Sequence, residues 1–279
     1  MAVDTRLTLS GCNFGWLHLE PLDKALAVLA DHGFTTLELT TAPPHVQSST
    51  MNREDHVDLA RRLDRYGLRA VSTNPTFCDI NLASTNPDFR ALSEDQIGRE
   101  LELASDIGAG TVVVMPGRLH ALAPAPAEVV RRDLIDSLTR LLDRAETAGV
   151  TIGLENSPYG YLGSSEELVA LTDEIDHPRL GIVYDVANAL AIEDPAEGIA
   201  TVAHRLVLTH LSDAWRDRWT HTSPGRGDID FAAIAGALSA IDYTGHNVYE
   251  LIDMEPPEPR LEEDIAALEK AGFACLDLA

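Results

Sequence analysis

The chain has few cysteines, few lysines and no long apolar run, and each shortage excludes a class of protein. Its 279 residues include three cysteines, Cys12, Cys78 and Cys275, which are too few for a disulfide framework. No run of about 18 apolar residues is present, so we expect no membrane-spanning helix and no membrane partner. The first residues also lack the basic and apolar stretches of a secretory signal. We therefore expect a cytoplasmic protein.

Basic residues are scarce as well. The chain has 21 lysines and arginines against 45 acidic residues, which gives a formal net charge of −24. Proteins that bind nucleic acids usually carry a basic patch that displaces counterions, so no nucleic-acid partner is expected. The only lysines, Lys24 and Lys270, both fall in helical patterns. Schiff-base chemistry, which needs a desolvated lysine in the site, therefore has no good candidate.

Short strand-like runs alternate with longer helical patterns along the whole sequence. Hydrophobic residues make up 45% of the chain, which is enough for one large core. The expected strands are residues 7–12, 35–40, 69–74, 111–115, 151–155, 180–185, 206–211 and 247–252. Eight strands alternating with helices predict an α/β fold, a single (β/α)8 TIM barrel that spans residues 1–279. The alternative, a doubly wound open sheet, usually shows a glycine-rich turn after its first strand, and this chain has no convincing one.

Several helix ends are also expected from the sequence. Ser164 and Glu167 have the spacing of a capping box at a helix start, and Ser93 and Gln96 have the same spacing. Gly149 stands where a helix would end in a left-handed cap.

Polar residues stand at or near the ends of four consecutive predicted strands: Glu155, Asp185, His210 and Glu250. Active sites of (β/α)8 barrels lie at the carboxyl ends of the strands. Each residue alone has an ordinary explanation, such as a helix cap, a loop anchor or a hydrogen-bonded core histidine. Together, three carboxylates so close to one another repel unless a cation or shared protons compensate. The group therefore predicts a binding site for one divalent metal ion.

The segments around these residues are also recognisable as a set. They are Gly153-Leu154-Glu155-Asn156, Tyr184-Asp185-Val186-Ala187-Asn188, His210-Leu211-Ser212-Asp213, Gly225-Arg226-Gly227-Asp228-Ile229-Asp230-Phe231 and Tyr249-Glu250. They resemble the xylose-isomerase-like TIM-barrel superfamily, in particular its sugar (phosphate) isomerase and epimerase group. The resemblance implies that Glu155, Asp185, His210 and Glu250 bind the metal and that the two glutamates also move protons. It also implies a small sugar-like substrate. The oxygen-rich ligands suit Mn²⁺, with Mg²⁺, Co²⁺ or Zn²⁺ as alternatives.

One position departs from the family pattern. Many members carry a histidine three residues after the aspartate that ends strand six, and this chain carries Asn188. That histidine contacts substrate in epimerases and a further metal in the endonuclease branch. An asparagine keeps a hydrogen-bonding group but cannot titrate, which argues against a multi-zinc endonuclease.

Five polar residues near the predicted metal site are candidates for substrate binding: Asn188, Asp213, Arg216, Arg218 and His221. Arginine binds hydroxyls, carboxylates and phosphates, although each arginine is as readily explained as a solvated surface charge. The rings of Trp16, Phe77 and Trp215 can stack on a sugar or pack in the core, and the sequence does not separate these roles.

These observations predict a divalent-metal-dependent isomerase or epimerase of a keto sugar or sugar derivative. A metal ion that chelates a carbonyl and an adjacent hydroxyl acidifies the neighbouring carbon, and either glutamate can then remove its proton to give an enediolate. The alternative is a lyase on the same site, a dehydratase or β-eliminating enzyme acting on an oxidised glycoside or keto-cyclitol. An abasic-site endonuclease and a non-catalytic barrel are further alternatives. Homo-oligomerisation is left open.

Overall fold

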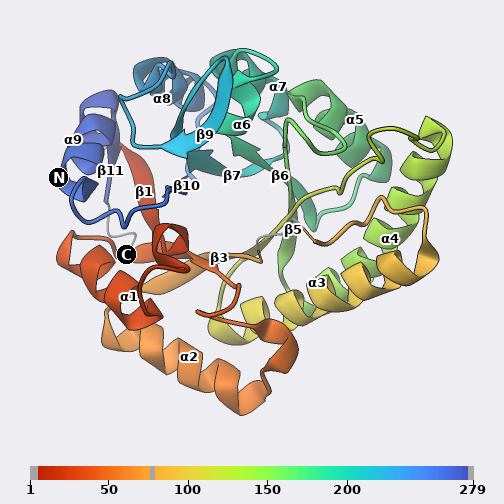
Figure 1. Cartoon of the computed structure of the whole chain (residues 1–279), viewed down its shortest axis with the longest axis horizontal. Coiled ribbons are helices and arrows are strands. Elements are labelled where there is room, and N and C mark those ends of the chain that lie inside the picture. The colour runs from red at the N-terminus through yellow and green to blue at the C-terminus, as the bar shows by residue number, and fades with distance from the viewer. Residues whose placement is uncertain (1–5, 76–78, 276–279) are drawn as a thin grey trace.

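Eight parallel strands form the centre of the molecule. A computed structural model describes residues 6–75 and 79–275, and in it the pairing runs from β1 through β7 to β10, which pairs with β1 and closes the barrel (Figure 1). The strands are β1 (Leu7–Cys12), β2 (Thr36–Thr40), β3 (Arg69–Asn74), β4 (Thr111–Val114), β5 (Thr151–Glu155), β6 (Leu180–Asp185), β7 (Leu206–Leu211) and β10 (His246–Tyr249). The predicted (β/α)8 TIM barrel is confirmed, and the open doubly wound sheet is excluded.

Helices surround the barrel on its outside, as Figure 1 shows. They are α1 (Leu22–Asp31), α2 (Arg53–Arg65), α3 (Pro87–Ile107), α4 (Ala127–Ala148), α5 (Ser165–Ile175), α6 (Val186–Leu190), α7 (Pro195–Val202), α8 (Phe231–Ala240) and α9 (Leu261–Ala271). A short strand, β11 (Phe273–Ala274), pairs with β1 outside the ring. Within residues 6–75 and 79–275, no helix has both the length and the apolar character needed to cross a bilayer.

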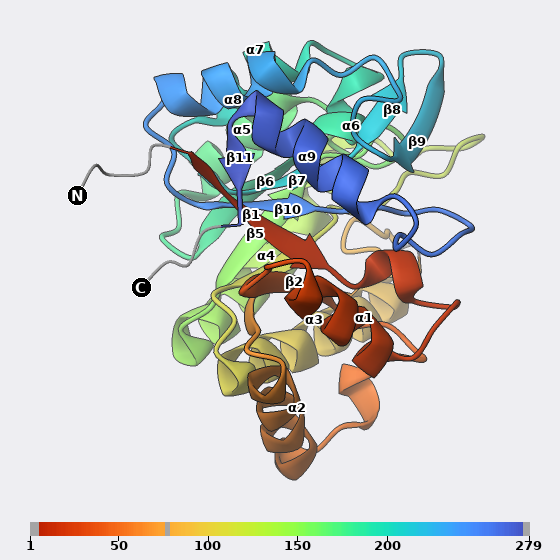
Figure 2. The same cartoon turned by 90° about the vertical axis from the view of Figure 1, so that its left-hand side faces the viewer.

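An antiparallel hairpin follows β7, made of β8 (Asp213–Trp215) and β9 (Arg218–Thr222). In the side view of Figure 2, the arrow of β1 points toward the end of the barrel at which this hairpin lies. The hairpin therefore stands at the carboxyl end of the strands, which is the end that carries active sites in this fold.

The strand boundaries agree with the sequence prediction except at a few ends. The largest difference is in the last barrel strand, which ends at Tyr249, so Glu250 follows the strand instead of lying inside it. The backbone N–H of Glu250 still donates to the carbonyl of Leu211, at 3.1 Å. Two residues later, Ile252 forms an isolated bridge with His221 of the hairpin. The chain thus leaves the barrel wall to meet the hairpin, and Glu250 is held at that junction.

Two of the three helix-end predictions are confirmed and one is wrong. Ser164 and Glu167 form the capping box of α5, and Gly149 ends α4 in a left-handed conformation. The helix expected to start at Ser93 begins earlier, at Pro87, after an Asn86 cap. The Ser93 hydroxyl instead donates to the carbonyl of Phe89, at 2.7 Å, which is the bond that lets a serine sit inside a helix.

The inside of the barrel is filled by a small apolar layer, separate from the larger core between barrel and helices. It consists of Cys12, Val71, Val113, Val183, Leu208 and Val248. Side chains two apart on a strand face the same side, so the residues two after Val183, Leu208 and Val248 also point into the barrel. These are Asp185, His210 and Glu250. An apolar layer therefore lies directly under the predicted metal ligands.

Gly153 occupies the corresponding position in β5, two residues before Glu155. A Cβ atom added there would come within 2.5 Å of Val183 Cγ2. A side chain at this point would force the interior layer to shift, and glycine leaves room for the valine below the site.

Candidate metal centre

The structure brings Glu155, Asp185, His210 and Glu250 together at the carboxyl ends of their strands. One ligand atom from each lies within 4.8 Å of the others, and all four residues are buried. His210 Nδ1 is at the centre of the group. It lies 2.9 Å from Glu155 Oε1, 3.3 Å from Glu250 Oε2 and 3.8 Å from Asp185 Oδ2. Three carboxylates and one imidazole are thus assembled around a common point.

The two carboxylate oxygens of Asp185 have different surroundings. Asp185 is the N-cap of α6, and its Oδ1 accepts the backbone N–H of Asn188 at 2.7 Å. Its Oδ2 is buried and has no hydrogen-bond partner. A buried carboxylate oxygen without a donor is costly, and such a group in a native site calls for a missing partner such as an ion. This oxygen faces the cluster, so the donor set fits a divalent cation.

The electrostatics of the cluster also favour an added positive charge. Burial raises the pKa of Asp185 and that of Glu155. Burial would lower the pKa of His210, but the negative charges of Glu250, Glu38 and Glu155 outweigh it and hold that pKa well above its usual value. The protein alone therefore balances its carboxylates with protons. A metal ion at the same point would replace them.

A fourth buried carboxylate, Glu38 in the middle of β2, lies beside the cluster and was not predicted from the sequence. Its side chain is completely buried, and its Oε2 lies 3.1 Å from His210 Nε2, the ring nitrogen opposite to the one that faces the other acids. Asn74 of β3 donates to Glu38 Oε1 at 3.0 Å and to Glu250 Oε1 at 3.1 Å. A signal was present, because Thr36-Leu37-Glu38-Leu39-Thr40 places a charge inside a buried strand.

Asn188 and His221 border the cluster on the side of the hairpin. His221 Nδ1 lies 3.6 Å from Asp185 Oδ2 and 3.7 Å from Glu250 Oε2. Asn188 accepts a hydrogen bond from the indole N–H of Trp219 at 2.6 Å, and the Trp219 ring contacts that of His221, with centroids 5.7 Å apart. The structure therefore places Trp219, which was not predicted, in contact with two predicted substrate-binding residues.

The other three predicted substrate-binding residues lie in the β8–β9 hairpin, before His221. Asp213 is completely buried, and its carboxylate accepts backbone N–H groups from Ala214, Gly225, Gly227 and Ile229 at 2.8–3.1 Å. It therefore shapes the loop from inside. Arg218 is exposed and stacks on the ring of Trp215, with its Cζ 3.9 Å from the ring centroid. Arg216 is also exposed.

The three aromatic residues considered for stacking on a sugar lie in different surroundings. Trp16 is completely buried in the core, so packing is its role. Trp215 is half-buried beneath Arg218. Phe77 lies outside the described residues, as does Cys78.

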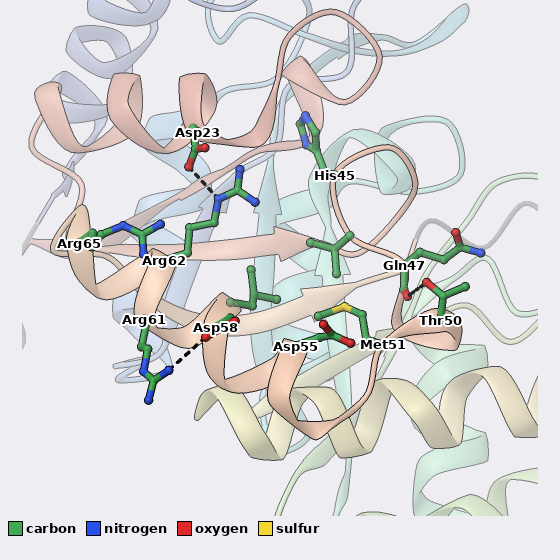
Figure 3. Close-up of a pocket in the computed structure, with 12 residues that line it drawn as sticks. Asp23, His45, Gln47, Thr50, Met51, Asp55, Asp58, Arg61, Arg62 and Arg65 are labelled. Carbon is green, nitrogen blue, oxygen red and sulfur yellow. Dashed lines mark hydrogen bonds and ion pairs between the residues drawn. The ribbon is translucent and has the colours of Figure 1, made fainter.

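A cavity of about 840 Å³ lies outside the barrel, between α1, the segment before α2 and α2 itself (Figure 3). None of the four clustered residues lines it. Its charged groups largely neutralise one another, since Arg62 Nε lies 2.7 Å from Asp23 Oδ1 and Arg61 Nη1 lies 3.1 Å from Asp58 Oδ1. The cavity is lined by acidic and basic side chains in similar number, so it is a weaker candidate for the reactive site than the metal cluster.

Comparisons with known proteins agree with this arrangement. Residues 26–271 match the model of the family described as the xylose isomerase-like TIM barrel. An uncharacterised protein of Methanocaldococcus jannaschii is 29% identical over 232 residues, which cover 81% of this chain and 78% of the relative. The L-ribulose 3-epimerase of a Methylomonas species is 23% identical over 261 residues, covering 92% of this chain and 87% of the epimerase.

Other enzymes occur among the relatives as well. The inosose dehydratase of Geobacillus kaustophilus is 24% identical over 260 residues, covering 82% of this chain and 79% of the dehydratase. Proteins named probable endonuclease 4 also match. The crystal structure of a D-tagatose 3-epimerase-like protein has a TM-score of 0.80 at 24% identity, covering 95% of this chain and 99% of the other, which shows a shared fold. Enzymes are thus found among the homologues, and sugar epimerases are among these enzymes.

Proposed function

The chain belongs to the xylose isomerase-like TIM-barrel family, and on that premise we propose that it is a divalent-metal-dependent isomerase or epimerase of a keto sugar or sugar derivative. One observation carries the proposal. Four potential ligand atoms converge within 4.8 Å at the barrel mouth, among residues that include a buried carboxylate oxygen with no partner. Sugar epimerases among the homologues supply the substrate class.

Glu155, Asp185, His210 and Glu250 would hold the ion. Three carboxylates and one imidazole are ligands that suit Mn²⁺, Mg²⁺ or Co²⁺, with Zn²⁺ also compatible, and Mn²⁺ is our first choice. When bound, the ion supplies a Lewis acid that polarises a substrate carbonyl and orients the hydroxyl beside it.

Glu155 and Glu250 are the proposed proton carriers. They approach the cluster from different strands, β5 and the end of β10, and each has one oxygen close to His210 Nδ1. Burial raises the pKa of Glu155, which brings this carboxylate closer to the basicity that a general base needs at neutral pH. If one glutamate removes the proton and the other returns it to the opposite face, the product is an epimer. Return to the neighbouring carbon gives an isomer.

The substrate would lie between the cluster and the β8–β9 hairpin. His221 and Asn188 border that space, and Trp219 packs on both. Arg216 and Arg218 stay predictions as contacts for more distant hydroxyl, carboxylate or phosphate groups. Asp213 would act through the loop that it orders. A cytoplasmic location, with a sugar-like molecule as the partner, completes the proposal.

Hydrogen exchange tests the proposal directly. Metal-stripped protein is reloaded with Mn²⁺, and a panel of keto sugars is incubated with it in deuterated water and followed by NMR. We expect deuterium at the carbon next to the carbonyl, loss of exchange with a chelator, and loss of exchange in Glu155→Gln and Glu250→Gln. Glu166→Gln, an exposed change on α5, is the matched control. A keto sugar that binds but exchanges no proton with any metal would refute the proposal.

A lyase is the second candidate, because dehydratases are among the relatives. It shares the first step, removal of the acidic proton, but a group on the next carbon then leaves. The same incubation distinguishes the two, since elimination gives an unsaturated product with new ultraviolet absorbance and a change in mass. Epimerisation and isomerisation conserve the mass.

A further inference from the structure

Glu38 is a buried acid that the proposed reaction does not use. It lies in the middle of β2, on the other side of the His210 ring from the metal cluster, and has no exposed surface. Its Oε2 is 3.1 Å from His210 Nε2. Burying a carboxylate is costly unless it is fully hydrogen-bonded, so this residue needs a reason to be present.

The hydrogen-bond partners of Glu38 determine which ring nitrogen of His210 carries a hydrogen. The Ser72 hydroxyl donates to its Oε2 at 2.8 Å, and the Asn74 amide donates to its Oε1 at 3.0 Å. A hydroxyl and an amide N–H therefore donate to the two oxygens of Glu38, and its side chain acts as an acceptor toward its neighbours. Its third partner, His210 Nε2, must then carry a hydrogen.

This hydrogen fixes the tautomer of a neutral His210. An imidazole with its hydrogen on Nε2 has its lone pair on Nδ1. Nδ1 is the nitrogen that lies 2.9 Å from Glu155 Oε1 and 3.3 Å from Glu250 Oε2, at the centre of the cluster. The lone pair is therefore aimed at the point where the ion would bind.

We propose that Glu38 is a positioning residue for the metal centre, holding His210 in the rotamer and tautomer that present Nδ1 to the ion. Asn74 extends this support, because its amide also donates to Glu250 Oε1 at 3.1 Å. One network from β2 and β3 thus orients ligands contributed by β7 and by the end of β10. The inference rests on the proposed metal centre and assigns a role to a residue outside the ligand set.

A purely structural role for Glu38 is the competing explanation, and the chain contains a suitable comparison. Glu100 is also a buried glutamate, with only 2% of its surface exposed, and it also accepts hydrogen bonds from two hydroxyls, those of Thr41 and Ser48. Among residues 6–75 and 79–275, the hydrogen bonds of Glu100 go to these hydroxyls and not to His210 or another residue of the cluster. Glu100→Gln therefore matches Glu38→Gln in chemistry and burial but not in position.

The test measures metal affinity and the histidine proton in the full chain. Mn²⁺ and Zn²⁺ affinities are measured by chelator competition for the wild type, Glu38→Gln and Glu100→Gln, with circular dichroism to verify folding. We expect Glu38→Gln to bind about 10- to 100-fold more weakly, which is the usual effect of losing an outer hydrogen-bond partner of a metal ligand, and Glu100→Gln to bind like the wild type. Nitrogen-15 NMR of the Zn²⁺-loaded wild type should show the His210 proton on Nε2.

The outcomes distinguish failure of the positioning role of Glu38 from failure of the proposed metal centre. Wild-type protein that binds no divalent ion refutes both. Wild-type protein that binds normally while Glu38→Gln binds equally well refutes the positioning role alone. If Glu38→Gln fails to fold, the wild-type spectrum decides, because a His210 proton found on Nδ1 in the loaded protein contradicts the assigned tautomer.

Discussion

Asp185→Asn is the substitution that best separates metal binding from folding. The Asp185 Oδ1 caps α6, whereas its Oδ2 is buried, has no hydrogen-bond partner and faces the cluster. Asparagine is as good an N-cap as aspartate, so the cap survives. Only the oxygen that faces the cluster is replaced, by an amide nitrogen that does not ligate. Because burial and the charge of Glu250 raise the pKa of Asp185, the metal-free variant should be at least as stable as the metal-free wild type.

The size of the effect follows from linkage between binding and folding. An ion supplied at about 1,000 times its dissociation constant stabilises the folded wild type by about 4 kcal/mol. For a domain of this size that corresponds to a rise of roughly 8–16 °C in melting temperature. If the loss of one of four ligands weakens binding about 100-fold, the stabilisation by the ion falls to about 1.4 kcal/mol, because each factor of ten in affinity is worth about 1.4 kcal/mol. The shift should then fall to roughly 3–6 °C.

Differential scanning fluorimetry of chelator-stripped protein, with and without Mn²⁺, measures both quantities. Asp194→Asn is the matched control, because Asp194 is the N-cap of α7 and accepts the backbone N–H groups of Ala196 and Glu197 away from the cluster. We expect its metal-induced shift to equal that of the wild type. An Asp185→Asn protein with the full wild-type shift would show that the ion does not bind at this oxygen, and a wild type without any shift would refute the metal centre.

Three further predictions test other parts of the structure. Burial raises the pKa of Glu100 to about 7 from 4.5, so this group favours the folded state below pH 4.5 and loses that advantage as the pH rises to 7. Urea unfolding should therefore show the wild type losing about 3 kcal/mol of unfolding free energy between these pH values relative to Glu100→Gln, and parallel pH profiles of the two proteins would contradict this. Asp213→Ala should lower the unfolding free energy by about 3 kcal/mol and speed proteolysis of residues 214–229, since four backbone N–H groups lose their acceptor, with Asp213→Asn less affected. Gly153→Ala should cost about 2 kcal/mol in thermal unfolding because its Cβ meets Val183 Cγ2 at 2.5 Å, and unchanged stability would mean that the interior layer can yield.

The fold could be predicted from the sequence because its signal is repeated. Eight alternations of strand and helix each carry weak information, and only one closed arrangement accommodates all of them. The ends of individual helices could be predicted less reliably than the fold. Ser93 and Gln96 have the spacing of a capping box, but Asn86 followed by Pro87 is a stronger start seven residues earlier, and Ser93 satisfies its hydroxyl within the helix. Local spacing cannot show which of two starts the tertiary structure uses.

The clustering of four predicted ligands was predictable for a different reason. The carboxyl ends of parallel barrel strands meet at one mouth, so residues ending consecutive strands converge whatever their side chains are. Glu38 was not found by this rule, because it lies in the middle of β2 and reaches the cluster through the opposite nitrogen of His210. Trp219 was missed because its position depends on the hairpin that folds back over the mouth, and hairpin geometry is not encoded in strand order.

Asn188 finally bears on which chemistry the cluster serves. Its amide nitrogen donates to the carbonyl of Asn156 at 2.9 Å and its oxygen accepts the indole N–H of Trp219 at 2.6 Å, so both polar groups are used within the protein. A neutral amide already bonded at both ends is a poor ligand for a second metal ion, and instead it holds an aromatic ring at the barrel mouth. The net charge of −24 also opposes a polyanionic substrate. Although endonucleases are among the relatives, these features favour a single ion acting on a small molecule over several ions acting on a nucleic acid.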